Sequence, residues 1–178
     1  RIIVRGALKL KAGMAEELRE IAAIADNPEP ATFANTLVAF ERTGRTLGRV
    51  GRIFSNLNGT VTNPVLQAVE KTLSPKLAAH RDAIMLNPAL FARLRTLFEA
   101  RATLGLDPES LRLLERTHDD FVRAGANLGA AEQVRLRALN AELATAHTTF
   151  AQNVLKERNA AALVVDTREE LAGLPEAA

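Results

Sequence analysis

The chain has 178 residues, enough for one domain with a buried core, and nearly half of them are hydrophobic. It has no Trp, no Tyr and only seven Phe, so its core must consist chiefly of Leu, Ala, Val and Ile, which favours helices. The lack of cysteine excludes disulfides and thiol chemistry, and a net charge of +2 is too small to predict nucleic-acid binding. No apolar run is long enough to span a membrane, and the longest near the start, Ile2–Val4, is too short for a signal-peptide core.

Apolar residues of helical period predict an antiparallel bundle of about six helices within a single domain, residues 1–178. The expected helices cover about 8–26, 32–57, a third beginning at 64, 88–105, 108–127 and 130–159. Pro75 is expected to kink or split the third helix after Leu73. A short strand at Ala162–Val165 and a short helix capped by Thr167 should follow. The first residue is Arg and the end resembles a cut, so we interpret the chain as a fragment of a larger helical protein.

Helix starts are marked by Asn or Asp directly before Pro. The Asn or Asp side chain accepts a free backbone amide, and Pro fits the first turn because its missing N–H would be unpaired there. The four dipeptides are Asn27-Pro28, Asn63-Pro64, Asn87-Pro88 and Asp107-Pro108. The first belongs to the turn 27–30, and the other three should begin helices.

Two rows of helical period run through residues 37–54. Basic residues form one row: Arg42, Arg45, Arg49 and Arg52. Apolar residues and glycines form the other: Leu37, Phe40, Gly44, Leu47, Gly51 and Phe54. This pattern predicts an amphipathic helix, and the segment lacks both Gly-x-Gly-x-x-Gly and a Walker lysine. The glycines would be tolerated where another helix backbone approaches closely. The arginine row is interpreted as a solvated face, and the alternative is a surface facing acidic substrate or an adjoining domain.

The three histidines give weak candidates for chemistry. Glu115 and His118 form one Glu-x-x-His, but a di-metal bundle needs a second such pair and two further glutamates. Glu142 lies five residues before His147, off the same helical face. We therefore expect His118 to pack flat at the edge of the core, with its ring nitrogens bonded locally. His80, in the triplet His80-Arg81-Asp82, lacks the other motifs of a kinase catalytic loop. No catalytic, cofactor or metal residue is assigned in this sequence.

Several stretches, taken together and in order, resemble one family. They are Asn27-Pro28-Glu29 with Thr32-Phe33 and Asn35-Thr36-Leu37, FSNLNGTVTN, LSPKLAAHRD, LNPALFARL, LGLDPESLRLLERTHDDFVRAGANL and NAAALVVDTREELAGLP. Their succession from about Ala12 to Pro175 is similar to the N-terminal region of bacterial peptidyl-dipeptidases (dipeptidyl carboxypeptidases). These enzymes belong to the zinc metallopeptidase family that includes oligopeptidase A and thimet oligopeptidase. The first eleven residues match poorly, and at His118 the family more often has an aromatic residue.

The resemblance implies an all-helical, cytoplasmic protein whose N-terminal domain walls a channel that admits short peptides. In the family, zinc is held by a His-Glu-x-x-His helix and a later glutamate, and the motif glutamate is the general base. This sequence has no His-Glu-x-x-His, so no zinc ligand or catalytic residue is carried over. The implied partners are short peptides and the protein's own catalytic domain, without nucleic acid or membrane. The fragment should be inactive and expose an apolar surface that allows weak self-association.

The alternative hypothesis is a free-standing helical scaffold that binds an acidic partner through the face from Arg42 to Arg52. It predicts a natural stop codon near Ala178 and a monomer whose surface is polar all round. Replacing Arg45 and Arg49 should then abolish a salt-sensitive interaction.

Overall fold

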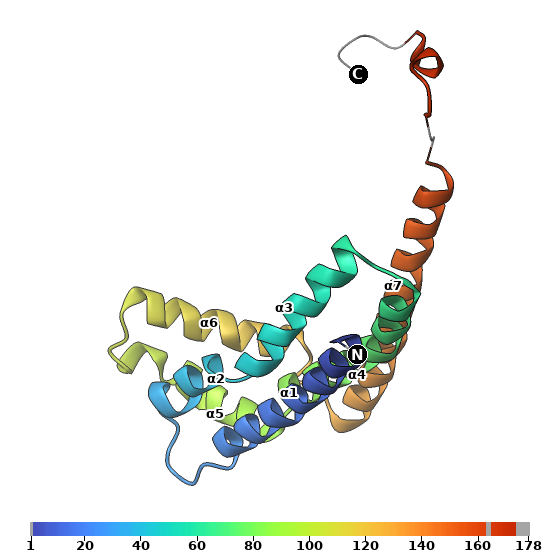
Figure 1. Ribbon diagram of the computed structural model, residues 1–178. Coiled ribbons are helices and arrows are strands. Elements are labelled where there is room, and N and C mark those ends of the chain that lie inside the picture. The colour runs from blue at the N-terminus through green and yellow to red at the C-terminus, as the bar shows by residue number, and fades with distance from the viewer. Residues whose placement is uncertain (1, 163–164, 174–178) are drawn as a thin grey trace.

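The computed structural model describes residues 2–162 and 165–173, and its regular structure in these ranges is helical (Figure 1). Six helices have twelve or more residues: α1 (Ile2–Ala25), α3 (Arg45–Thr60), α4 (Pro64–Met85), α5 (Pro88–Glu99), α6 (Pro108–Arg123) and α7 (Ala130–Ala160). Shorter elements are the π-helical turn η1 (Phe33–Val38), α2 (Ala39–Glu41) and the 3-10 turns η2 (Arg101–Thr103) and η3 (Arg168–Leu171). The predicted all-α fold is confirmed.

The helix caps predicted at three Asn-Pro or Asp-Pro dipeptides are all confirmed. Asn63 accepts the amides of Val65 and Leu66 at the start of α4. The other two caps follow the same pattern: Asn87 accepts the amide of Leu90 at α5, and Asp107 accepts the amides of Glu109 and Ser110 at α6. Asn27 instead accepts the amide of Glu29 within the turn after α1. Each side chain pairs an amide that the helix or turn leaves free, which is why these local signals hold.

The single helix expected at residues 32–57 is wrong, because the segment is broken at Gly44. Thr32 caps its start as predicted, in a reciprocal pair of hydrogen bonds with Asn35. The chain then passes through η1 and α2, and Gly44 adopts a φ of 67° before α3 begins at Arg45. This left-handed conformation costs glycine little, and it turns the chain so that α3 runs back along α1 (Figure 1).

Pro75 was expected to kink or split α4 after Leu73, and the split does not occur. The helix is continuous from Pro64 to Met85. Proline removes one N–H from the helical ladder, and α4 compensates by tertiary packing because it contacts both α1 and α7. The hydroxyl of Ser74 accepts a 2.8 Å hydrogen bond from Thr148 of α7, which anchors the helix directly beside the proline.

The short strand expected at Ala162–Val165 is not formed at Ala162 or Val165, and residues 163–164 lie outside the described part. The amide of Ala162 donates to the carbonyl of Asn159 and so continues the final turn of α7. A strand needs a neighbouring strand to pair its backbone groups, and none of the described residues forms a strand. Thr167 precedes the 3-10 turn η3, where a short helix was expected.

The hydrophobic core lies between α1, η1, α5 and α6. Leu37 and Leu114 are completely buried at its centre, and Phe121 packs against Phe40 and Phe91 with ring centroids 5.6 Å and 6.1 Å apart. The α4–α7 pair extends from this core, and α7 contributes only Thr148 to the buried residues. Many apolar side chains of α7 are therefore solvent-exposed in this chain. Within the described ranges, no helix combines the length and the hydrophobicity required for a membrane span.

Candidate functional site

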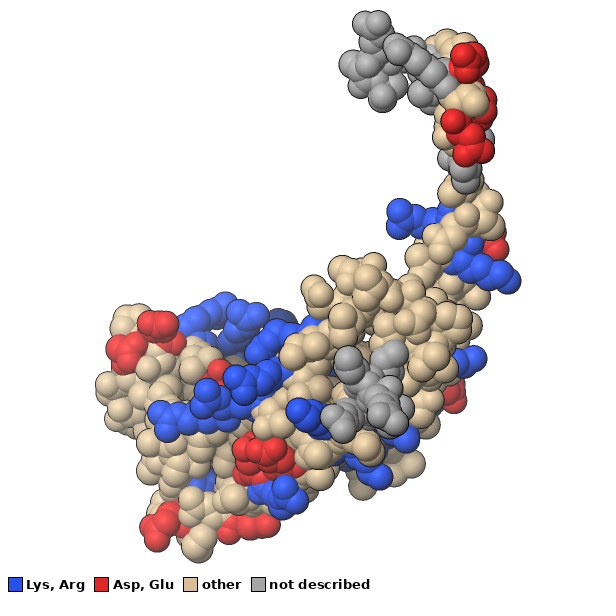
Figure 2. All heavy atoms as spheres, viewed as in Figure 1, with Lys and Arg blue, Asp and Glu red and all other residues tan. Residues whose placement is uncertain are grey.

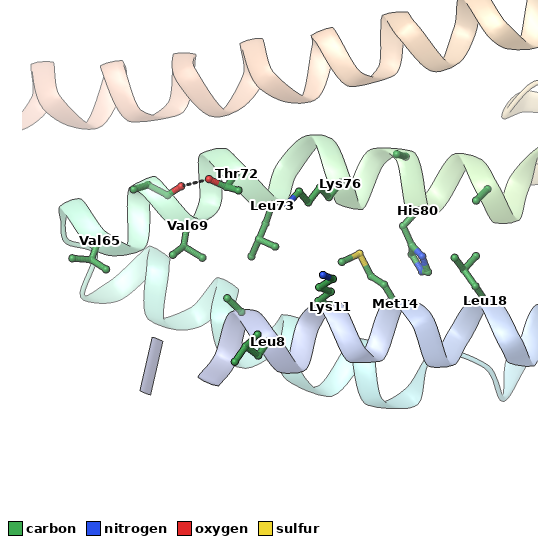
Figure 3. A pocket seen from close by; sticks show the side chains of 14 residues that line it. Leu8, Lys11, Met14, Leu18, Val65, Val69, Thr72, Leu73, Lys76 and His80 are labelled. Carbon is green, nitrogen blue, oxygen red and sulfur yellow. Dashed lines mark hydrogen bonds between the residues drawn. The ribbon is translucent and has the colours of Figure 1, made fainter. Parts of the chain in front are cut away.

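An apolar groove of about 850 Å³ runs between α1 and α4 (Figure 3). Met14 and Leu73 line its middle, and the aliphatic side chains of Leu8 and Val65 line one end, where they are 62% and 57% exposed. Side chains this apolar and this exposed mark a surface suited to contact with another apolar surface. The groove lining also includes two lysines, Lys11 of α1 and Lys76 of α4.

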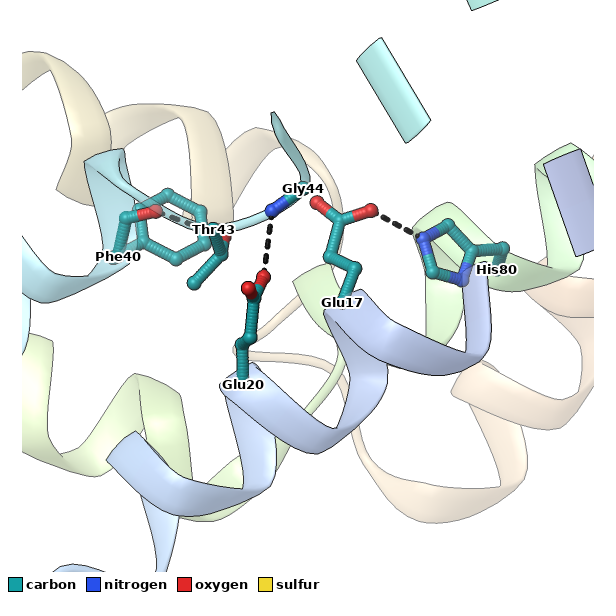
Figure 4. A network of polar contacts seen from close by, with 6 residues as sticks. All are labelled: Glu17, Glu20, Phe40, Thr43, Gly44 and His80. Carbon is teal, nitrogen blue, oxygen red and sulfur yellow. Dashed lines mark hydrogen bonds and ion pairs between the residues drawn. The ribbon is translucent and has the colours of Figure 1, made fainter. Parts of the chain in front are cut away.

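A polar network joins three segments and includes His80, which also lines this groove (Figure 4). Glu17 of α1 lies 2.7 Å from Nε2 of His80 on α4, and both side chains are largely buried. Glu20, one turn further along α1, accepts the backbone amide of Gly44 at 2.8 Å. The carboxylate of Glu17 also occupies the space beside Gly44, where a side-chain Cβ would have to lie. Two carboxylates of α1 therefore fix both α4 and the turn before α3.

The His80–Glu17 pair has two parts of a catalytic triad, but the groove supplies no activated nucleophile. Its lining contains neither Ser nor Cys, and its one hydroxyl, on Thr72, donates to the carbonyl of Ala68 within α4. A nucleophile must instead be hydrogen-bonded to the histidine that activates it. Nδ1 of His80 is buried without a hydrogen-bond partner among the described residues. This arrangement supports a structural role for His80.

The triplet His80-Arg81-Asp82 does not converge on one site. His80 points towards α1, Arg81 is exposed, and Asp82 accepts a 2.8 Å hydrogen bond from Asn140 of α7. The three side chains point in different directions because consecutive residues on a helix are separated by about 100° around its axis. The resemblance to a kinase catalytic loop therefore has no structural counterpart here.

His118 packs flat, as expected, and does not pair with Glu115. Its ring stacks on Phe98 with centroids 3.8 Å apart and planes 5° apart, and it lies 5.7 Å from the ring of Phe91. Nδ1 of His118 is buried without a hydrogen bond and lies 3.8 Å from the Asp119 carboxylate, so the expected local bonding of that nitrogen is not found.

Glu115 instead faces two arginines, Arg101 and Arg112, at 3.8 Å and 3.9 Å. His147 is exposed on α7 beside a hollow of about 610 Å³ between α4 and α7. Within residues 2–162 and 165–173, no three His, Cys, Asp or Glu side chains are grouped as metal ligands would be.

A second hollow, which we term the basic cavity, has a volume of about 800 Å³ and lies between α1 and α3. Arg45, Arg49 and Arg52 of α3 line it together with Lys9 of α1. Figure 2 shows basic side chains gathered over the start of α3. The arginine row predicted from the sequence therefore does face solvent on α3, although Arg42 lies before the break at Gly44 and outside the cavity lining.

Sequence reasoning did not identify the α1 residues of these sites, namely Lys9, Glu17 and Glu20. Glu17 and His80 are 63 positions apart in the chain, so no spacing motif connects them. The proposed close approach of helix backbones does occur, but at a different glycine. A Cβ on Gly13 of α1 would lie 3.0 Å from the backbone of Leu47 on α3, whereas one on Gly51 would meet nothing within 4 Å.

Comparison with known proteins confirms the resemblance inferred from the motifs. The chain is 42% identical over 164 residues to the dipeptidyl carboxypeptidase of Escherichia coli (strain K12), a match that covers 92% of this chain and 24% of that protein. The dipeptidyl carboxypeptidase of Salmonella typhimurium is 42% identical over 162 residues, which are 91% of this chain and 24% of that protein. Oligopeptidase A of Haemophilus influenzae is 24% identical over 147 residues, which are 83% of this chain and 22% of that protein.

No family model matches the chain. The chain spans about a quarter of the length of the curated relatives that it matches. Over that quarter, and over nine-tenths of its own length, it is similar to bacterial dipeptidyl carboxypeptidases.

Proposed function

We propose that this chain is the N-terminal helical domain of a zinc-dependent peptidyl-dipeptidase that removes dipeptides from the C-termini of short peptides. In this proposal the domain forms one wall of the substrate channel and is inactive alone. The observation that carries it is the 42% identity, which extends over 92% of this chain but only 24% of the relative. Such a pattern is expected of one region of a longer enzyme, whose remaining length would contain the catalytic residues.

The described residues of this chain do not fit a zinc site. His80 contacts the carboxylate of Glu17, His118 is stacked on Phe98, and His147 is exposed on α7. Catalytic zinc needs three protein ligands within about 2 Å of one point, and none of the described residues forms such a group. We therefore assign no catalytic step to these side chains and propose that the zinc ligands lie outside this sequence. The cytoplasmic location implied by the resemblance is part of the same proposal.

Exposed apolar residues support the proposal that another part of the protein packs on this domain. Leu8 and Val65 flank the groove, Ile53 is 58% exposed on α3, and on α7 Leu143 and Phe150 are 66% and 68% exposed. Burying apolar area contributes about 25 cal/mol per Å², so these faces would stabilise contact with a catalytic domain. When the chain is alone, the same faces favour weak self-association.

The alternative hypothesis of a free-standing scaffold predicts a surface that is polar all round, and that prediction is wrong. The exposed apolar side chains of α1, α3, α4 and α7 contradict it. The basic cavity is the one observation that favours partner binding through α3, and it is compatible with a domain of a peptidase.

The reading frame beyond Ala178 tests the proposed function most simply. We expect it to continue without a stop and to encode His-Glu-x-x-His, followed by a further glutamate, within the length of the relatives. A stop codon near Ala178, or an extension without that motif, would contradict the proposal. Expression of the complete frame should then yield a chelator-sensitive enzyme that releases dipeptides from C-termini.

A further inference from the structure

We propose that the basic cavity binds the carboxylates of an acidic peptide segment. The ligand class follows from the side chains that line the cavity, and the identification of the peptide as a substrate rests on the proposed function. If both hold, the enzyme would prefer short peptides that carry Asp or Glu over neutral peptides of the same length.

The first argument is the convergence of four cationic side chains on one hollow. Arg45, Arg49 and Arg52 are separated by four and three residues and therefore lie on one face of α3. Lys9 reaches the same hollow from α1. Because Gly13 has no side chain, α1 and α3 approach so closely that a Cβ at this position would lie 3.0 Å from the backbone of Leu47. This close packing holds the two helices that carry the cations at a fixed separation.

The second argument is that these charges lack counter-ions. No carboxylate among the described residues lies within 4.0 Å of the cationic groups of Lys9, Arg45, Arg49 or Arg52. The acidic residues beside the turn, Glu17 and Glu20, are occupied by His80 and by the amide of Gly44. Because the whole chain has a net charge of only +2, four unpaired cations at one hollow are a local excess of positive charge. Carboxylates placed there would relieve the mutual repulsion.

The third argument distinguishes a peptide from a nucleic acid. The lining of the basic cavity has no aromatic residue on which a base could stack. Guanidinium groups bind carboxylates in a bidentate manner, which suits Asp and Glu side chains. A volume of about 800 Å³ fits a few residues of an extended peptide, and it is a compact hollow in contrast to the long basic track expected for a polynucleotide.

Fluorescence anisotropy of the 178-residue chain with labelled peptides tests this inference. The probes are a peptide with four consecutive glutamates, the same peptide with four glutamines, and an oligothymidylate. We expect the glutamate peptide to bind at low salt, to bind more weakly as salt rises, and to bind at least about tenfold more tightly than the glutamine peptide. Equal affinity for the two peptides, or tighter binding of the oligothymidylate, would overturn the proposal.

Paired variants locate the binding site. The double substitution Arg45→Gln/Arg49→Gln should weaken glutamate-peptide binding by about tenfold or more, because two of the four cations are removed. The matched control is Arg135→Gln, which removes an exposed arginine of α7 outside the cavity lining and should leave affinity unchanged. All replaced side chains are exposed, so the helical circular dichroism of each variant should equal that of the parent. Equal affinities of the double and control variants would place the binding elsewhere and contradict the inference.

Measuring kcat/KM of the complete enzyme for acidic and neutral peptides distinguishes failure of this inference from failure of the proposed function. For Arg45→Gln/Arg49→Gln we expect kcat/KM to fall by about tenfold more for acidic peptides than for neutral peptides of the same length. The control Arg135→Gln should leave hydrolysis of both peptide classes unchanged. Equal loss or no loss for both peptide classes would overturn the acidic-peptide site while the peptidase function stands. Binding of the glutamate peptide by a protein without peptidase activity would support the site and contradict the function.

Discussion

The substitution Gly44→Ala tests the turn on which the placement of α3 depends. Gly44 has a φ of 67° and a ψ of 16°, the left-handed region that residues with a Cβ rarely adopt. The Cβ of alanine would also overlap the carboxylate of Glu17, which is bound to His80. The substitution therefore strains the backbone and displaces a buried polar contact at the same time.

The two costs are estimated separately. The left-handed conformation costs a residue with a Cβ about 1–2 kcal/mol. Displacing Glu17 weakens the 2.7 Å contact to His80, whose Nδ1 already lacks a partner among the described residues, and a fully unsatisfied buried group would cost about 1–3 kcal/mol. Because Glu17 is the flexible end of a long side chain and retains part of its contact, we expect the free energy of unfolding to fall by about 2–4 kcal/mol.

Urea denaturation followed by circular dichroism at 222 nm measures this loss. The control Gly51→Ala lies within α3, where an added Cβ meets nothing within 4 Å, and should stabilise the chain by about 0.5–1 kcal/mol. In a Glu17→Ala background, Gly44→Ala should cost only the backbone term, about 1–2 kcal/mol. A Gly44→Ala variant as stable as the parent would refute the left-handed turn, and equal losses in both backgrounds would refute the Glu17 contact.

Three further predictions concern packing and capping. Gly13→Ala should destabilise the chain by about 1 kcal/mol or more in urea, despite the better helix propensity of alanine, because its Cβ would press on the Leu47 backbone. Leu114→Ala should lower the free energy of unfolding by about 2–5 kcal/mol, since Leu114 is fully buried; a loss near zero would contradict this core assignment. Hydrogen bonds from the side chain and the amide of Ser110 lower the pKa of Asp107 below its ordinary 3.8. The stability contributed by ionised Asp107 is therefore present above pH 3.8 and is lost as the pH falls through the lower pKa of the folded state. Asp107→Asn should keep the helix cap and lose this pH dependence, which urea denaturation at a series of acidic pH values measures.

The features predicted correctly from the sequence are those set by neighbouring residues. The caps at Asn63, Asn87 and Asp107 form because the side chain and the amides that it accepts lie within three residues of each other. The extent of α7 follows in the same way from a long apolar period, and its observed range differs from the expected one by a single residue.

The features predicted incorrectly depend on contacts between distant segments. The apolar period around Gly44 is compatible both with a continuous helix and with a break at this glycine. The carboxylates of α1 that contact the break are distant in sequence, so a local pattern does not reveal them. Pro75 is the converse case: a local rule predicts a kink or a split after Leu73, and the split does not occur because α4 packs against both α1 and α7. At Ala162 and Val165 the expected strand is not formed, because a single extended segment has no partner strand of its own.

The candidate sites show the same difference between local patterns and contacts between distant segments. The arginine row was evident from its spacing, but the cavity that it lines also needs Lys9, which precedes the stretch covered by the family resemblance. The pairing of His80 with Glu17 joins two helices and could not be inferred from sequence spacing. For His118 the local context sufficed, since its position among apolar residues indicated flat packing, which the stack on Phe98 confirms.

Hydrolysis by the purified 178-residue chain tests the central claim, that this domain has no catalytic centre, most directly. The chain would be incubated with a peptide whose N-terminus is blocked, with added zinc or with a chelator, and the release of C-terminal dipeptides would be followed by mass spectrometry. Our account predicts no release under either condition and release by the complete enzyme. Chelator-sensitive release by the 178-residue chain alone would contradict the account.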